Sequence, residues 1–393
     1  MYVPDNSSAG LYIHVPFCTS VCPYCDFAVT IAGEERRSAW ADGVVREAAM
    51  YSDCGMEFDT VYFGGGTPSA LNPQELSDIV AGLRQNLSIS DNATLHLEAN
   101  PEDATVENLD AWRDLGVEFV SLGVQSFDDR GLRFLGRRHS ALRAVEAVEA
   151  LLGAGFHTVS IDLIYGLEGQ TAANWRAQLD RAVGFGVQHL SCYQLTFHEE
   201  TVFGRQLRLG VITETPERLQ EELFFLTHEL LSAAGCGAYE VSNFAREPEH
   251  RSHHNQKYWD HTPYLGLGPS AHSFDGCRRW WNRRKLRLWQ TDIDAGKNPI
   301  EDREQPSNKQ LVLEALMLGF RTSAGVDLDQ LSSRFDIGLW TPNAALIDRL
   351  LDAGLVQAMG SRLQPTLAGF AVADTLARSF DIPGSPTETG SVT

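Results

Sequence analysis

The sequence predicts an α/β protein: a parallel βα barrel or partial barrel, followed by a mixed segment and a small helical, winged-helix-like module. Short apolar runs with strand character alternate with helix-length segments through the first part of the 393-residue chain, which favours a parallel sheet. About six such units precede residue 240, which suits a barrel better than a small sandwich. Beyond that point the periodicity weakens, and a helical pattern resumes at Asn308.

Each unit pairs a short apolar run with a helix-length pattern. The expected strands cover residues 11–15, 60–63, 94–98, 119–123, 158–164 and 189–194. The expected helices cover residues 34–52, 73–87, 106–115, 142–154, 172–185 and 216–234. The loops that follow parallel strands share one face of a barrel. Polar motifs at the strand ends are therefore expected to converge there.

Four segments are expected along the chain: a barrel over 1–240, a mixed segment over 241–305, a module over 306–380 and a disordered tail over 381–393. In the module, helices are expected from Asn308 and over 328–335, 344–353 and 368–377, with a β-hairpin over 354–366. Three helices and a hairpin are typical of a winged-helix-like module. The tail is rich in small, polar and proline residues, which predicts disorder.

The net charge of −20 argues against binding to nucleic acids. No apolar run is long enough to span a membrane, and the first residues do not resemble a signal peptide, so a cytoplasmic protein is expected. One stretch, RRWWNRRKLRLW over 278–289, is basic and rich in tryptophan. Packing against the acidic barrel ranks first for it, contact with a ligand's carboxylates second, and contact with an anionic membrane surface third.

Three of the seven cysteines fall within eight residues: Cys18, Cys22 and Cys25. In a cytosolic chain such clustering indicates a metal or redox site instead of a disulfide framework. Thiolates suit zinc and iron–sulfur clusters. A structural zinc site needs four protein ligands, which His14 or a distant residue would have to complete. Three thiolates on a four-iron cubane instead leave one iron open for chemistry.

The C-x3-C-x2-C spacing, with Tyr24 before the last cysteine, resembles the signature of the radical SAM superfamily. The run GGGTP over 64–68 resembles the superfamily's glycine motif. Further segments, LEANPED, SLGVQSF, LGRRH and IDLIYGLEGQT, are similar to its coproporphyrinogen-oxidase-like branch. The resemblance implies a partial (βα)6 barrel, a 4Fe–4S cluster on the three cysteines, and S-adenosylmethionine (SAM) on its open iron. The implied SAM contacts are Tyr12, Gly65, Gly66, Thr67, Glu98, Gln125, Arg137 and Asp162.

Two functions of different classes remain within this branch. One is an enzyme, the oxygen-independent coproporphyrinogen III dehydrogenase; the other is a heme chaperone of the HemW type. The dehydrogenase pattern adds a fourth cysteine where this chain has Phe27. The dehydrogenase also has a longer segment before its first strand, whereas only ten residues precede Leu11 here. Both features favour the chaperone.

The segment HNQKYW over 254–259 matches the HNxxYW motif that is associated with heme in the chaperone group. The resemblance implies heme contacts at His254, Tyr258 and Trp259, with His253 the alternative ligand. Imidazole is a common ligand of heme iron, and aromatic rings suit a porphyrin face. The implied partners are heme and heme-accepting respiratory proteins, while a homodimer and peripheral membrane contact are compatible with the sequence.

Overall fold

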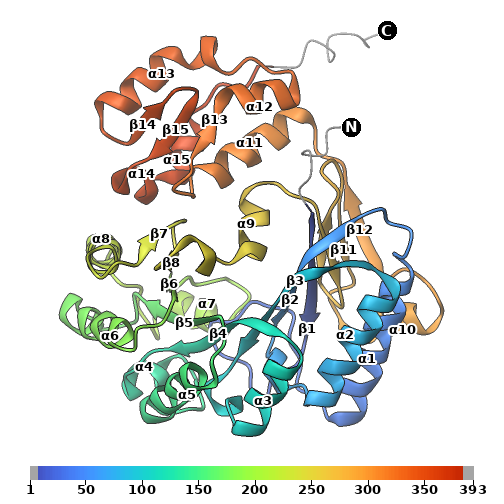
Figure 1. Ribbon diagram of the computed structural model, residues 1–393. Helices are drawn as coiled ribbons and strands as arrows, with labels where there is room; N and C mark the ends of the chain where they lie inside the picture. Colours follow the sequence, from blue (N-terminus) through green and yellow to red (C-terminus); the bar gives the residue numbers. More distant parts are fainter. Residues whose placement is uncertain (1–7, 384–393) are drawn as a thin grey trace.

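The computed structural model describes residues 8–383, and its centre is a curved twelve-stranded sheet (Figure 1). Six consecutive strands pair in parallel, in chain order. These are β1 (Ala9–Val15), β2 (Glu57–Gly65), β3 (Ser88–Ala99), β4 (Val117–Gln125), β5 (Thr158–Tyr165) and β6 (His189–Gln194). The predicted α/β class with six parallel βα units is therefore confirmed.

Helices cover the outer face of these strands, as Figure 1 shows. They are α1 (Glu34–Ala49), α2 (Pro73–Asn86), α3 (Val106–Asp114), α5 (Ala141–Ala154), α6 (Ala172–Gly184) and α8 (Glu217–Ala233). Local signals set their ends: Asn72 and Glu75 form a capping box at the start of α2, and Gly155 ends α5 with φ 77°. Trp40, Trp112 and Trp175 are each at most 1% exposed and belong to the barrel core.

Several short elements in the barrel loops were not expected from periodicity. They are α4 (Asp129–Phe134), α7 (Val202–Arg208), η1 (Pro68–Ala70), η2 (Pro101–Asp103) and η3 (Pro248–His250). One or two turns are too short to show a helical period in the sequence.

The mixed segment extends the sheet at both edges. β9 (Tyr264–Leu267) pairs in parallel with β1, and β10 (His272–Phe274), β11 (Arg279–Asn282) and β12 (Ile300–Glu304) follow in antiparallel order. At the other edge, β8 (Asn243–Ala245) and β7 (Gly237–Ala238) pair beyond β6. Helix α9 (His253–Trp259) packs against β1 and β2, and α10 (Leu286–Asp294) packs against α1.

The basic, tryptophan-rich stretch is built into this extension. Trp289 is fully buried and donates its indole N–H to the Glu47 carboxylate at 3.0 Å. The same carboxylate accepts from Asn282 Nδ2 at 2.6 Å and from the Gly268 N–H at 2.7 Å. Arg279 pairs with two glutamates and Arg283 with Asp292. These contacts support the first-ranked interpretation, in which the basic stretch packs against the rest of the protein. Within residues 8–383, no helix is long and apolar enough to cross a membrane.

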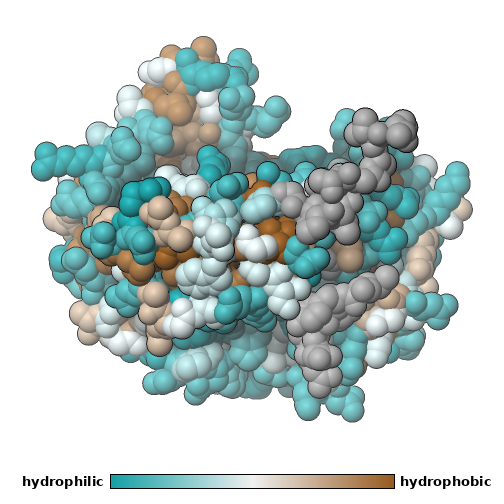
Figure 2. Space-filling view, turned by 90° about the horizontal axis from the view of Figure 1, so that it is seen from above, coloured by the Kyte–Doolittle hydropathy of each residue, from teal (hydrophilic) through white to brown (hydrophobic). Residues whose placement is uncertain are grey.

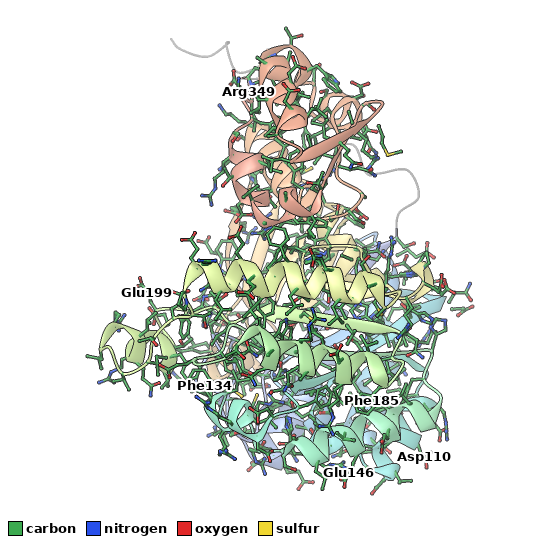
Figure 3. All side chains as sticks on the ribbon, turned by 90° about the vertical axis from the view of Figure 1, so that its left-hand side faces the viewer. Asp110, Phe134, Glu146, Phe185, Glu199 and Arg349 are labelled. Atoms are coloured by element: carbon green, nitrogen blue, oxygen red, sulfur yellow. The ribbon has the colours of Figure 1, made fainter. Side chains whose placement is uncertain are left out.

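The C-terminal module stands on the barrel with its own apolar core (Figure 3, where Arg349 marks it). Its elements are α11 (Asn308–Gly319), β13 (Val326–Asp327), α12 (Leu328–Phe335), α13 (Trp340–Asp352), β14 (Val356–Met359), β15 (Arg362–Pro365), α14 (Leu367–Ala371) and α15 (Ala373–Arg378). Helices α11, α12 and α13 together with the three-stranded sheet of order β13–β15–β14 agree with the winged-helix expectation.

Two details of the module differ from expectation. The last helix is two helices, because Val372 leaves helical geometry with φ −126° and ψ 23°. The tail begins later than residue 381: the Asp381 N–H bonds Asn343 Oδ1 at 2.8 Å, and Ile382 is only 5% exposed. These contacts tie residue 381 to α13 and bury residue 382 in the module's core, while residues 384–393 lie outside the described chain.

Figure 2 views the molecule from the side of this module. Hydrophilic residues cover most of the visible surface, and apolar residues gather near the middle of the view. A mostly hydrophilic surface is expected for an acidic chain that buries most of its apolar residues.

Candidate cofactor site

A cavity of about 450 Å³ opens at the carboxyl ends of the parallel strands. Its wall includes Cys18, Cys22 and Cys25 from the loop after β1, and Gly65, Gly66 and Thr67 at the end of β2 and just after it. Glu98, Gln125, Arg137 and Asp162 reach it from β3, from β4, from the loop after α4 and from β5. The structure therefore brings together residues that are up to 144 positions apart, counted from Cys18 to Asp162.

All three cysteines of the loop are free thiols with partial exposure. Thr67 donates its hydroxyl to the Cys18 sulfur at 3.4 Å, and Arg137 Nη1 lies 3.8 Å from the Cys22 sulfur. The backbone N–H of Cys18 bonds Thr30 O at 3.0 Å, which fixes the start of the loop. The sulfurs thus face the cavity with hydrogen-bond donors beside them, as in tuned iron–sulfur sites.

The zinc alternative finds no support. Among residues 8–383, no group of three or more His, Cys, Asp or Glu is placed to hold a single metal ion. His14 is occupied elsewhere: its Nε2 bonds Ala28 O at 2.9 Å and its Nδ1 bonds the Tyr12 hydroxyl at 3.1 Å. A cubane binds each thiolate through a different iron, so its ligands need not converge on one point. The donor set fits a 4Fe–4S cluster.

Glycines next to the cysteines create room for a ligand. A Cβ on Gly66 would lie 2.7 Å from Phe17 O and 3.1 Å from the Cys18 sulfur. Gly65 has φ 109°, and a Cβ there would lie 2.5 Å from His14 Nδ1. Only glycine fits at either position, so backbone polar groups can approach a bound molecule closely.

Two partly buried carboxylates face the same space. Glu98 accepts from the Tyr62 hydroxyl at 2.8 Å and from the Gly65 N–H at 3.1 Å, and burial raises its pKa to about 7. Asp162 accepts from Ser121 Oγ at 2.8 Å, and burial raises its pKa to about 6. Bringing a cation into this cavity would favour ionisation of both groups.

Arg137 and Gln125 complete the wall. Arg137 Nη2 bonds Asn100 Oδ1 and donates to Gly123 O at 2.9 Å. Gln125 has φ 64°, a conformation that a non-glycine residue adopts at a cost and that is often found at functional sites. Sequence reasoning missed Asn100, Tyr62 and Ser121. Asn100 and Ser121 stand inside the LEANPED and SLGVQSF segments, so the motifs themselves held that signal.

Tyr12, another predicted SAM contact, lies beside two aromatic rings inside the barrel. It is not among the residues that line the cavity; its hydroxyl bonds His14, and its ring centroid lies 6.1 Å from that of Tyr62 and 6.4 Å from that of His254. Its contact with SAM therefore stays a prediction, and what the structure adds is that its side chain points into the barrel. The physical reason is strand alternation: Tyr12 shares a face with His14, two residues on, inside the barrel.

The motif residue His254 also lies inside the barrel. It is 1% exposed, its Nδ1 bonds Thr60 Oγ1 at 2.9 Å, and its Nε2 bonds the Tyr258 hydroxyl at 3.0 Å. Its ring stacks on Tyr62 at 4.9 Å. In this conformation neither ring nitrogen is open to iron. Neighbouring His253 is exposed at the start of α9, and Tyr258 and Trp259 are partly exposed.

The raised pKa values predict a pH-dependent affinity for SAM. SAM carries a net positive charge, and Glu98 and Asp162 lose their protons as pH rises through about 7 and about 6. The dissociation constant for SAM should therefore fall about tenfold between pH 6 and 8, since the ionised share of a group with pKa near 7 rises about tenfold. Titration of the anaerobically reconstituted protein checks this. The Glu98→Gln variant should bind SAM more weakly, and its affinity should vary less with pH. A wild-type affinity for SAM that does not change with pH would contradict the prediction.

Sequence comparison divides the chain in the same way as the structure does. Residues 12–182 match the Radical SAM superfamily, and residues 307–372 match the HemN C-terminal domain. A heme chaperone HemW of Synechocystis sp. is 36% identical over 331 residues, which cover 82% of this chain and 80% of that protein. The chain belongs to the HemW family. A second HemW, from Mycobacterium tuberculosis, is 34% identical over 94% of both chains.

Relatives of HemW under another name also match. The mouse (Mus musculus) protein named radical S-adenosyl methionine domain-containing protein 1, mitochondrial, is 32% identical, with 95% of this chain and 88% of that protein covered. Among solved structures, coproporphyrinogen III oxidase (HemN) from Escherichia coli superposes with a TM-score of 0.81 at 21% identity, covering 94% of this chain and 89% of that one. That likeness shows the fold alone. Membership of the radical SAM superfamily implies a 4Fe–4S cluster and SAM, which the cavity fits.

Proposed function

We propose that this protein is a heme chaperone, which binds heme and transfers it to acceptor hemoproteins. The observation that carries the proposal is the extent of the similarity: a protein named heme chaperone HemW is 34% identical over 94% of both chains, module included. A shared barrel alone would not separate the two functions, because fold does not determine function.

The residue two positions after the last cysteine of the triplet supports the chaperone over the dehydrogenase. Phe27 stands where the dehydrogenase pattern has a further cysteine, and its side chain is 63% exposed. Val21 and Ile31 of the same loop are 51% and 63% exposed. An exposed apolar rim at the cavity mouth suits contact with a large apolar ligand or a partner surface. We also propose that the protein is cytoplasmic, that it contacts the membrane surface peripherally and that it forms a homodimer.

The chain's own residues would hold the cofactors as follows. Cys18, Cys22 and Cys25 would ligate a 4Fe–4S cluster, which in its reduced state would supply the electron for reductive cleavage of SAM. The Gly65–Gly66 backbone would accommodate the methionine end. Glu98 and Asp162 would accept hydrogen bonds from its amine or ribose hydroxyls, and the buried Arg137 would offer its guanidinium to a carboxylate.

The HNxxYW segment would contribute to the heme site. His254, Tyr258 and Trp259 are proposed heme contacts, with His253 as the alternative ligand. Since both ring nitrogens of His254 are hydrogen-bonded, direct ligation by His254 would require one of these two bonds to break. His253, exposed at the first residue of α9, would not require this.

Heme titration tests the function. The protein with its cluster reconstituted should bind heme saturably at a stoichiometry near one, followed by optical absorption, and should pass it to an added heme-free hemoprotein. Coproporphyrinogen, SAM and a reductant should yield no decarboxylated product. Failure to bind heme together with decarboxylation would instead establish the dehydrogenase, which shares this fold.

A further inference from the structure

A second cavity lies outside the barrel, between the β9–β12 extension and the C-terminal module. It encloses about 440 Å³ and shares no lining residue with the cofactor cavity. That volume falls within the range of ligand pockets, about 300–1,000 Å³. Its wall is mostly aromatic: Tyr258, His261, Tyr264, His272, Phe274, Arg279, Trp281, Glu304 and Leu318. We refer to it as the aromatic groove.

Strand pairing explains why aromatic side chains gather there. His272 stands opposite Trp281, and Phe274 stands opposite both Arg279 and Tyr264, so these side chains share one face of the sheet. The alternate residues face the barrel side, where Trp280 donates to the Tyr51 hydroxyl at 3.2 Å. One face of the extension is thus used for packing on α1. The other face is left open beside α11, which also contacts α9 (Figure 1).

His272 is the side chain in the groove that is best placed to reach a metal. It is exposed, and its ring stacks on Trp281 with centroids 5.7 Å apart and an interplanar angle of 25°. Within residues 8–383 no hydrogen bond engages its ring nitrogens. Partial desolvation of the ring by its neighbours, and next the charge of Arg279, lower its pKa, which favours the neutral imidazole that binds metals.

A second histidine lies at the closed end of the groove. His261 is 5% exposed, adopts φ 55°, and its Nδ1 has no hydrogen-bond partner. Its Nε2 lies 3.3 Å from Glu314 Oε2. A buried polar atom without a partner costs free energy, so it indicates a site that a ligand or water completes.

The charges in the groove argue against a small anion as its ligand. Arg279 already pairs with Glu304 at 2.9 Å and with Glu314 at 2.7 Å. Its guanidinium is therefore neutralised and does not select for a free phosphate or carboxylate. Broad rings, one open imidazole and a neutralised cation fit a flat apolar ligand that carries a metal, with its acidic groups directed to solvent.

We infer that the aromatic groove binds an iron porphyrin and that the His272 ring ligates its iron. The inference rests on the proposed chaperone function and gives it a location. It also gives the HNxxYW segment a positioning role: His254 accepts or donates the hydrogen bond that holds the Tyr258 hydroxyl at 3.0 Å, and the Tyr258 ring lines the groove against Tyr264 at 4.7 Å.

The test is a heme titration of His272→Gly, read by optical absorption. Loss of a ligating imidazole should weaken heme binding at least about tenfold. Even the loss of a residue that only hydrogen-bonds to a metal ligand lowers metal affinity about 10–100-fold. The absorption spectrum of bound heme should change, and added imidazole should restore it by filling the space. Trp281→Leu should weaken binding without changing the ligand signature. His157→Gly is the control, because His157 is exposed, stacks on His250 and lies outside both cavities.

Each other outcome has a definite meaning. Wild-type heme binding that is unchanged in His272→Gly but lost in His254→Ala or His253→Ala would overturn the inference and place the iron on the HNxxYW segment. Wild-type protein that binds no heme would overturn the chaperone proposal itself. Because SAM binding depends on the separate cavity, an unchanged SAM affinity in His272→Gly shows that the variant is folded.

Discussion

Replacing Cys22 with alanine should abolish the 4Fe–4S cluster. The loop after β1 supplies three thiols to the cavity, and the superfamily's cluster already has one iron without a protein ligand. Removing one of the three thiolates would leave two of the four irons without a protein ligand, and such a cluster loses iron. After anaerobic reconstitution, iron and sulfide content and the charge-transfer absorption should fall to background. Cys18→Ala and Cys25→Ala should behave alike.

Cys277→Ala is the matched control for this loss. Cys277 is also a partly exposed free thiol, but it does not line the cavity, so its variant should keep the full cluster. The metal-free variants should unfold at temperatures close to that of the wild type, because the cysteine loop adds little to the core. Full iron content in Cys22→Ala would contradict the ligand assignment.

Replacing Gly65 with alanine should destabilise the protein and eliminate SAM binding. The left-handed backbone at Gly65 costs an alanine about 1–2 kcal/mol, and the new Cβ would meet the His14 ring at 2.5 Å. Overpacking adds about 1–3 kcal/mol, so the free energy of unfolding should fall by about 2–5 kcal/mol. His14 cannot retreat freely, because both of its ring nitrogens are hydrogen-bonded. Urea unfolding and SAM titration measure the two effects.

Gly55→Ala separates backbone strain from the steric clash. Gly55 has φ 71°, but a Cβ there would meet no atom within 4 Å. Its variant should lose only about 1–2 kcal/mol and should bind SAM like the wild type. Equal losses in the two variants would show that the contact with His14 is unimportant and that strain alone explains the result.

The barrel could be predicted because its signals are local. The βα units show in apolar runs whose strand ends agree with the structure to within a few residues, such as His189–Gln194. Caps such as Ser140 before α5 and Thr171 before α6 act within three residues of the helix start. The cysteine spacing and the glycine run are also contiguous. Strand order then brings them together, because parallel strands end on one face.

The mixed segment could not be predicted because its contacts are long-range. Strands β9 to β12 have three to five residues each, too few to show a period of two. Their pairing joins residues far apart in the chain, as where Arg279 stands opposite Glu304. The same limit explains Tyr12 and His254: a motif shows which residues recur together, but only packing shows that both rings lie inside the barrel.

By itself, the sequence determined the barrel, the cysteine loop and the family to which they point, since these depend on periodicity, spacing and short motifs. Only the tertiary structure decided which histidines are accessible. His254 and His272 are the same type of residue. His254 is enclosed between Thr60 and Tyr258, whereas His272 is exposed and stacks on Trp281. Accessibility is a property of the neighbours that folding assembles, and those neighbours come from strands and helices distant in the chain.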